Sequence, residues 1–184
     1  MVDLNKIIQA KRTIANFVRN TELYESKKLS VLSGAEVFVK RENLQRTGAY
    51  KIRGAYNKIA HLSEEQKQGG VIAASAGNHA QGVALSAREF GVRAVIVMPE
   101  STPLLKVIGT KNLGAEVILK GNNFDEAYAY AVEYANENNL VFVHPFNDEL
   151  IQAGQGTIAL EMLESVPDLD YIVAPVGGGG LISG

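Results

Sequence analysis

The sequence predicts an α/β protein built on parallel β-sheets. Short runs rich in Val and Ile recur along the chain, and each is almost continuously apolar, as strands covered on both faces are. Stretches with helical patterning lie between several of these runs. Strands that alternate with helices in this way are typical of βαβ units, in which neighbouring strands run parallel.

Each apolar run is expected to form one strand. The expected strands are Glu36–Lys40, Gly69–Ala74, Arg93–Met98, Ala115–Lys120, Leu140–His144 and Asp170–Val176. The runs between Val71 and Val143 should form a self-contained βα unit, because helical segments separate them.

Helices are expected at the N-terminus and between the strands. The first eighteen residues form an amphipathic pattern, with a predicted buried side of Ile7, Ile8, Ile14, Phe17 and Val18. A further helix should begin directly after Lys51. The later helices are expected at His79–Phe90, Pro103–Asn112, Asn123–Asn138 and Glu149–Glu164. Pro103 suits a first helical turn, and Gly91 and Gly114 stand where helices commonly end.

The composition narrows the classes of function. At 184 residues and 46% hydrophobic, the chain is typical of a globular protein with a large core, and it has no cysteine for disulfide or thiolate chemistry. A net charge of −2 gives no support for nucleic acid or anionic membrane as a partner. No apolar run reaches the length of a membrane span or signal peptide. We therefore expect a cytoplasmic protein that acts on a small molecule.

The glycine run in "PVGGGG", Pro175–Gly180, is a candidate phosphate site. It follows an expected buried strand and precedes "LISG", which has the pattern of a helix beginning. Glycines at such a turn let consecutive backbone N–H groups converge on one anion, and the helix N-terminus favours negative charge. The run indicates a phosphate, although not which compound carries it.

The stretch "SAGNHAQG", Ser75–Gly82, lies at a second junction between a strand and a helix. One interpretation is a helix cap provided by Ser75 or Asn78. The other is a site for a small carboxylate, because the same hydroxyl and N–H groups suit an anion. Ligands of parallel sheets bind beyond the carboxyl ends of the strands, where this loop and the glycine run are both expected.

Lys51 stands where a turn meets a helix, within "TGAYKIRGAYNKI". A desolvated lysine loses part of its proton affinity and becomes a nucleophile towards carbonyl groups. A phosphate site, a carboxylate site and a reactive amine together suggest pyridoxal phosphate, whose aldehyde bonds covalently to lysine.

The chain resembles the pyridoxal-phosphate-dependent serine/threonine ammonia-lyases, the family of threonine dehydratase, from about Thr21 to its last residue. The resemblance is carried by motifs in the family's order and spacing, namely "TGAYKIRGAYNKI", "SAGNHAQG", "AGQGTIALE" and "PVGGGGLISG". It implies the fold type II class of these enzymes, which is similar to the tryptophan synthase β-subunit, with two three-layer α/β/α domains. Residues 54–146 would form the smaller domain, and residues 1–53 and 147–184 part of the larger one, truncated at 184.

The resemblance also assigns roles to residues. Lys51 would be the catalytic lysine bonded to the cofactor, beside Tyr50. Asn78 would contact the phenolic oxygen of the cofactor. The phosphate would be held by Gly177, Gly178, Gly179, Gly180 and Leu181. The substrate carboxylate would be bound by Ser75, Gly77, Asn78 and His79. No metal site is expected, and the complete protein is expected to be a homo-oligomer, either a dimer or a tetramer.

The reaction implied is β-elimination of water from threonine or serine, giving 2-oxobutanoate or pyruvate and ammonia, in isoleucine biosynthesis or threonine catabolism. Ala76 stands where serine racemases of this family carry a second serine, which favours lyase over racemase chemistry. Ala49, Tyr50 and "TEL" at Thr21–Leu23 depart from the commonest family pattern without removing a proposed chemical group. Because the partner of the cofactor's pyridine nitrogen would lie beyond position 184, we expect an N-terminal portion with a half-built site.

Other functions are less well supported by the sequence. A synthase acting on substrates such as O-acetylserine, or a serine racemase, would use the same cofactor. "AGQGTIA" matches a dinucleotide fingerprint, but it does not follow an expected strand, which argues against a non-catalytic nucleotide-binding module. Ser75 and His79 lack the Gly-x-Ser-x-Gly context of a serine hydrolase. The three histidines, His61, His79 and His144, are too scattered in sequence to predict a metal centre.

Overall fold

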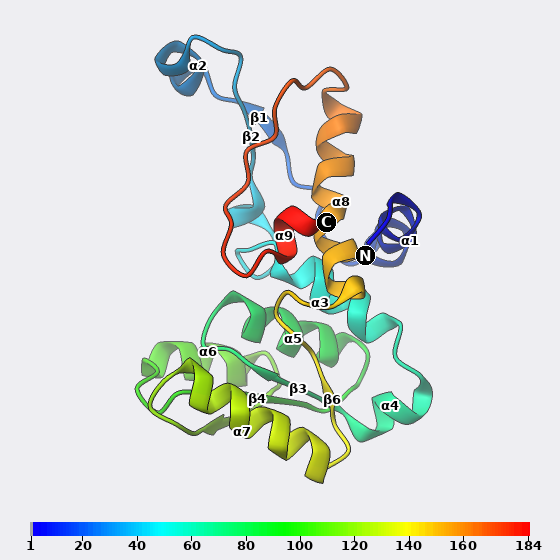
Figure 1. Cartoon of the computed structure of the whole chain (residues 1–184), viewed down its shortest axis with the longest axis vertical. Coiled ribbons are helices and arrows are strands. Elements are labelled where there is room, and N and C mark those ends of the chain that lie inside the picture. The colour runs from blue at the N-terminus through cyan, green and yellow to red at the C-terminus, as the bar shows by residue number, and fades with distance from the viewer. Residues whose placement is uncertain (1) are drawn as a thin grey trace.

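A four-stranded parallel sheet forms the lower part of the molecule in Figure 1, a computed structural model that describes residues 2–184. The strand order is β5-β4-β3-β6. Its strands are β3 (Val71–Ala74), β4 (Ala94–Met98), β5 (Glu116–Leu119) and β6 (Val141–Phe142). All three pairings are parallel. The carboxyl ends of the strands therefore meet at one edge, so the loops that follow β3 and β6 are neighbours.

Helices cover both faces of this sheet (Figure 1). On one face, α7 (Phe124–Glu137) packs its alanines against alternate residues of the strands, such as Ile72 and Val95. On the other face, α5 (Asn78–Glu89) and α6 (Leu104–Asn112) pack against residues that include Val71, Ile96 and Met98. Because successive side chains of a strand point to opposite faces, a strand that is apolar throughout serves both layers.

The upper part of the molecule is built from helices around α3 (Lys51–Ala60). This helix lies between α5 and α8 (Glu149–Ser165), and α1 (Leu4–Ile14) packs against α8. The remaining elements are an antiparallel pair, β1 (Leu23–Glu25) and β2 (Phe38–Lys40), with α2 (Lys27–Ser33), the 3-10 turn η1 (Glu42–Leu44), α4 (Glu64–Gly69) and α9 (Gly180–Ser183).

Glycines bring α3 unusually close to both neighbouring helices. A Cβ atom on Gly154 would lie 2.5 Å from the Gly54 Cα, and one on Gly54 would lie 2.6 Å from the Ile151 carbonyl oxygen. On the opposite side, a Cβ atom on Gly82 would lie 3.2 Å from the backbone of Ile52. The backbones of α3, α5 and α8 are therefore in direct contact, and this contact determines where the first residue of α3 lies.

Most predicted elements are confirmed, including the parallel βα unit and the helix expected after Lys51, which starts one residue earlier, at Lys51 itself. The run Glu36–Lys40 does contain β2, but β2 pairs antiparallel with β1 in a separate two-stranded sheet. Ile8 was wrongly assigned to the buried side of the first helix, since its side chain is 36% exposed. The domain boundaries at residues 53/54 and 146/147 stay a prediction.

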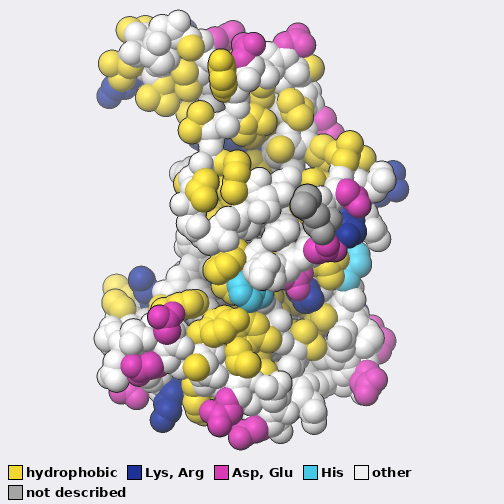
Figure 2. All heavy atoms as spheres, viewed as in Figure 1, with side chains coloured by type: hydrophobic (Ala, Val, Ile, Leu, Met, Phe, Trp, Pro, Cys, Tyr) yellow, Lys and Arg dark blue, Asp and Glu magenta, His cyan; other side chains and the backbone are white. Residues whose placement is uncertain are grey.

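The predicted buried strand at Asp170–Val176 is wrong. Residues 171–176 have no regular secondary structure, and Tyr171 and Val173 are 88% and 95% exposed. An apolar run becomes a strand when another strand accepts its backbone hydrogen bonds, and the described residues provide none beside it. Figure 2 shows hydrophobic side chains gathered over the upper end of the molecule, where this segment and the β1–β2 pair lie.

Candidate active site

Lys51 is the first residue of α3, and its side chain is only partly exposed. Its ammonium nitrogen donates a hydrogen bond to the Pro145 carbonyl oxygen at 2.6 Å and lies 5.5 Å from the centre of the Tyr50 ring. Burial lowers the pKa of Lys51. The residue before it, Tyr50, has helical dihedral angles and makes no side-chain cap.

The loop between β3 and α5 contains the residues predicted to bind a carboxylate. Gly77 precedes the first residue of α5 and caps it without a side chain, and its N–H donates to the Ser75 hydroxyl oxygen at 3.2 Å. Asn78 begins the helix and is exposed. The loop therefore presents backbone N–H groups at the carboxyl edge of the sheet, as the motif predicts.

His79 differs from the other residues of this loop because its side chain is buried, with 3% exposed. Its Nε2 donates to the Val143 carbonyl oxygen at 2.9 Å, which leaves Nδ1 as a buried nitrogen without a hydrogen-bond partner. Burial lowers the pKa of His79 to about 4, and the nearby Lys51 adds to this effect. Its imidazole is therefore neutral, and any contact it makes with a substrate carboxylate falls to its backbone N–H.

The glycine run forms a tight loop that ends at α9. Gly179 has a φ of +83°, a conformation that favours glycine. A Cβ atom on Gly178 would overlap the Phe146 ring, and one on Gly180 would lie 2.7 Å from the Phe146 Cβ. Gly177 has open space around it, and Leu181 is partly exposed at the start of α9. The loop thus lies directly on Phe146, where side chains would not fit.

Residues Val143–Asn147, which we name the β6–α8 segment, contact all three parts of the candidate site. Val143 binds His79, Pro145 binds Lys51, and Phe146 supports the glycine loop. The motifs of the sequence did not include this segment. The signal that could have found it is its position, because it follows a strand of the parallel sheet at the same edge as the Ser75–Gly82 loop.

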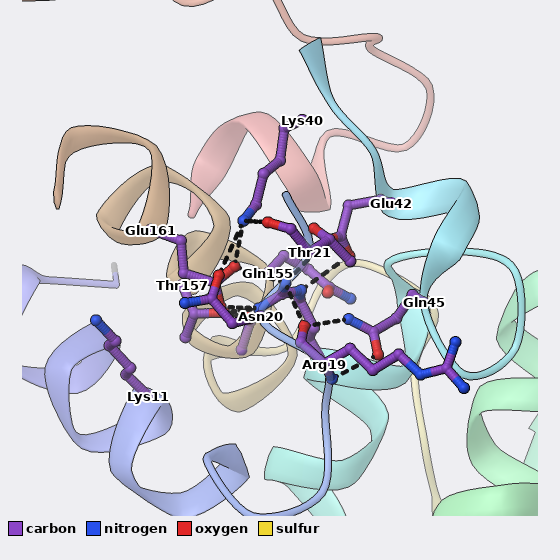
Figure 3. A network of polar contacts seen from close by, with 12 residues as sticks. Lys11, Arg19, Asn20, Thr21, Lys40, Glu42, Gln45, Gln155, Thr157 and Glu161 are labelled. Carbon is purple, nitrogen blue, oxygen red and sulfur yellow. Dashed lines mark hydrogen bonds and ion pairs between the residues drawn. The ribbon is translucent and has the colours of Figure 1, made fainter. Parts of the chain in front are cut away.

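A buried network of charged side chains surrounds Arg53 in the first turn of α3 (Figure 3 shows this network). Arg53, which is 0% exposed, donates two hydrogen bonds to Glu42 at 2.8 Å each and two to Glu161 at 2.6 and 2.9 Å. Lys40 also pairs with Glu161 at 2.5 Å. The network joins η1, α3 and α8, so it connects the helix of Lys51 to segments far apart in the sequence.

Residues 14–184 match the family model described as pyridoxal-phosphate-dependent enzyme. The chain belongs to this family.

Two kinds of relative of this member of the pyridoxal-phosphate-dependent enzyme family are informative. The L-threonine ammonia-lyase of Thermotoga maritima is 59% identical over 184 residues, which is all of this chain and 46% of that protein. Maize serine racemase is similar in structure, with a TM-score of 0.95, 39% identity, and coverage of 98% of this chain and 55% of that one. Threonine deaminase isoform 2 of Solanum lycopersicum gives a TM-score of 0.91, 40% identity, and coverage of 98% and 51%.

These matches confirm the fold type II class for this chain. The chain spans about half the length of the relatives it matches. The residues present fit pyridoxal phosphate: Lys51 offers a partly desolvated amine, and the glycine loop offers backbone N–H groups with no side chain over Gly177. No helix within residues 2–184 is long and apolar enough to cross a bilayer.

The alternative chemistries find little support in the geometry. The Ser75 hydroxyl accepts from Gly77, while the His79 ring bonds to Val143, so the two do not form a nucleophile and base pair. Gly154 and Gly156 of the "AGQGTIA" match lie inside α8, not at a turn between a strand and a helix. Among the described residues there is no group of three or more His, Cys, Asp or Glu placed to hold a metal ion.

Burial of His79 predicts a loss of stability in acid. The unfolded chain binds a proton at a pKa of about 6.5 and the folded protein at about 4, so stability falls as pH drops below about 6.5. Between about pH 7 and about pH 5 this residue should remove about 2 kcal/mol from the free energy of unfolding.

The measurement is urea unfolding of the complete gene product at both pH values, compared with His79→Gln. Glutamine keeps an N–H donor for Val143 but does not titrate, so the variant should lose about 2 kcal/mol less on acidification. Equal losses in the two proteins would show that His79 is not held neutral by the fold.

Proposed function

We propose that the complete protein carrying this chain is a pyridoxal-phosphate-dependent threonine ammonia-lyase. It converts L-threonine to 2-oxobutanoate and ammonia, and L-serine to pyruvate and ammonia, by β-elimination. The observation that supports this most strongly is the setting of Lys51, a partly buried amine with a lowered pKa in a chain 59% identical to an L-threonine ammonia-lyase.

Each part of the site has a role in this proposal. When bound, pyridoxal phosphate withdraws electrons from the substrate Cα and so makes its proton acidic. The Lys51 amine takes that proton, and the Pro145 carbonyl holds the amine in place through its hydrogen bond. The β-hydroxyl then leaves with a proton as water, and hydrolysis of the released enamine gives the 2-oxo acid and ammonia.

The surrounding loops bind the two anionic groups. The N–H groups of Gly77, Asn78 and His79 and the Ser75 hydroxyl bind the substrate carboxylate, and Asn78 reaches the phenolic oxygen of the cofactor. Gly177, Gly178, Gly179, Gly180 and Leu181 hold the phosphate, and Tyr50 lies beside the reactive lysine. Fixing these groups on the ends of α3 and α5 keeps the Cα–H bond aligned with the lysine.

Serine racemisation is the second candidate, and the likeness to maize serine racemase favours it. Ala76 argues against it. Ala76 packs against the hydrophobic core and carries no proton to give to the opposite face of the substrate. A homo-oligomeric assembly, a cytoplasmic location and a role in isoleucine biosynthesis or threonine catabolism stay part of the proposal.

The test is an assay of the complete gene product with pyridoxal phosphate. L-threonine, L-serine and O-acetylserine are supplied in turn, and release of 2-oxo acid and ammonia is measured together with formation of D-serine. We expect turnover of threonine above that of the other two substrates. Rapid formation of D-serine would favour racemase chemistry, and consumption of O-acetylserine alone would favour a synthase.

A further inference from the structure

The shape of the β6–α8 segment depends on one side chain, His144. Its Nδ1 accepts hydrogen bonds from the N–H groups of Phe146 at 3.2 Å and Asn147 at 2.8 Å. These two bonds close a turn around Pro145. The carbonyl that binds Lys51 and the ring that supports the glycine loop therefore both belong to a turn closed by His144.

Aromatic neighbours fix the orientation of this imidazole. The His144 ring packs edge to face on Phe146, with ring centres 4.6 Å apart and an angle of 89°. Tyr128 of α7 and Phe142 of β6 lie 6.0 and 6.2 Å away in similar geometry. With the ring held from several sides, Nδ1 faces the two N–H groups and the proton of the neutral imidazole is on Nε2.

We propose that His144 is a positioning residue of the active site, which aligns Lys51 with the glycine loop by closing the turn between them. The inference rests on the proposed function, because the alignment matters for the cofactor that these two elements hold together. His144 touches neither substrate nor cofactor in this proposal, and it acts through Pro145 and Phe146.

The arrangement requires a neutral His144. A proton on Nδ1 would place three N–H groups against one another and break both hydrogen bonds of the turn. The charged or titratable groups that face this ring are Lys51 of α3, His79 of α5, Tyr128 of α7 and Asp148 at the start of α8. Burial lowers the pKa of His144 and Lys51 adds to this, while Asp148 opposes it. The alignment of Lys51 with the glycine loop should therefore be lost as the pH falls below the range in which histidines ordinarily titrate.

The experiment compares two substitutions in the complete gene product. In His144→Asn, the amide oxygen can accept from the same two N–H groups, as in an Asx turn, but it does not titrate. In His144→Leu, the volume is kept and the acceptor is lost. His61→Leu is the matched control, because His61 bonds to the Asn57 carbonyl at the opposite end of α3.

Four quantities are measured for each protein: kcat, KM, the dissociation constant of pyridoxal phosphate and the absorbance of the bound cofactor. We expect His144→Leu to lower kcat between about 10-fold and 100-fold and to weaken cofactor binding, with its absorbance altered. His144→Asn should restore most of kcat and of cofactor binding, and it should flatten the acid limb of the pH profile of kcat. His61→Leu should match wild type.

Wild-type kinetics and absorbance in His144→Leu would overturn the positioning role. So would failure of His144→Asn to restore a folded, cofactor-binding protein, or an acid limb in that variant identical to wild type. If His144→Leu does not fold, the acid limb of His144→Asn decides the question. A wild-type protein that binds no pyridoxal phosphate would overturn the proposed function, and with it this inference.

Discussion

Replacing Lys51 with alanine should lower kcat for threonine by at least about 10³-fold and remove covalent attachment of the cofactor. The amine is the proposed base for the Cα proton, and general base catalysis of this kind contributes about 10² to 10⁴ in rate. Its setting at the start of α3, with the Pro145 carbonyl 2.6 Å away, is not reproduced by another lysine of the described chain.

The measurement is borohydride reduction of the complete gene product with pyridoxal phosphate, followed by peptide mass mapping, alongside steady-state kinetics. Label should appear on the peptide that contains Lys51 and be lost in Lys51→Ala. Lys67→Ala is the control, since Lys67 pairs at 2.8 Å with a Glu64 side chain that is 84% exposed. A label on a peptide without Lys51 would disprove the assignment.

Replacing Arg53 with methionine should lower the free energy of unfolding by about 3–5 kcal/mol. Methionine fills much of the volume, but it leaves the carboxylate of Glu42 without its guanidinium partner and that of Glu161 with Lys40 alone, in a buried region. Breaking a buried ion pair by removing one partner is costly because the remaining charge has lost its solvation and its counter-charge.

An exposed arginine of the same geometry provides the control. Arg93 also makes a two-pronged pair with a glutamate, Glu116, at 2.8 and 2.9 Å, but the two side chains are 45% and 57% exposed. Arg93→Met should change stability by less than about 1 kcal/mol. Urea unfolding of both variants gives the comparison. Equal losses in the free energy of unfolding would show that burial does not make the Arg53 ion pairs more important for stability than the exposed Arg93 pair.

The parallel sheet was predictable because its signal is local. Val71–Ala74 and Ala94–Met98 are apolar at every position, and a strand covered on both faces needs no other information. The glycine run and the loop after β3 were found for a similar reason, since each joins a local pattern to the edge of the sheet where ligands bind. The role of Lys51 could be predicted only from its own motif together with the glycine run and the Ser75–Gly82 loop.

The segment 170–176 and His144 could not be predicted because their state depends on distant parts of the chain. Val173 has the composition of a strand residue, yet pairing requires a neighbouring strand, and the run itself does not reveal whether one is present. His144 is one of three histidines in the sequence. Its role follows from a turn that brings the Pro145 carbonyl to Lys51, a residue 93 positions before His144 in the chain. Arg53 likewise shows no motif for its buried partners.

Direct backbone contact on both sides of α3 has a consequence for behaviour on heating. At Gly54, Gly82 and Gly154 the backbone of this helix touches its neighbours directly, so at these points few side-chain rotamers can loosen gradually as temperature rises. Lys51 should keep its orientation up to the melting transition and lose it abruptly there. Heat inactivation and loss of helical circular dichroism should therefore follow one curve.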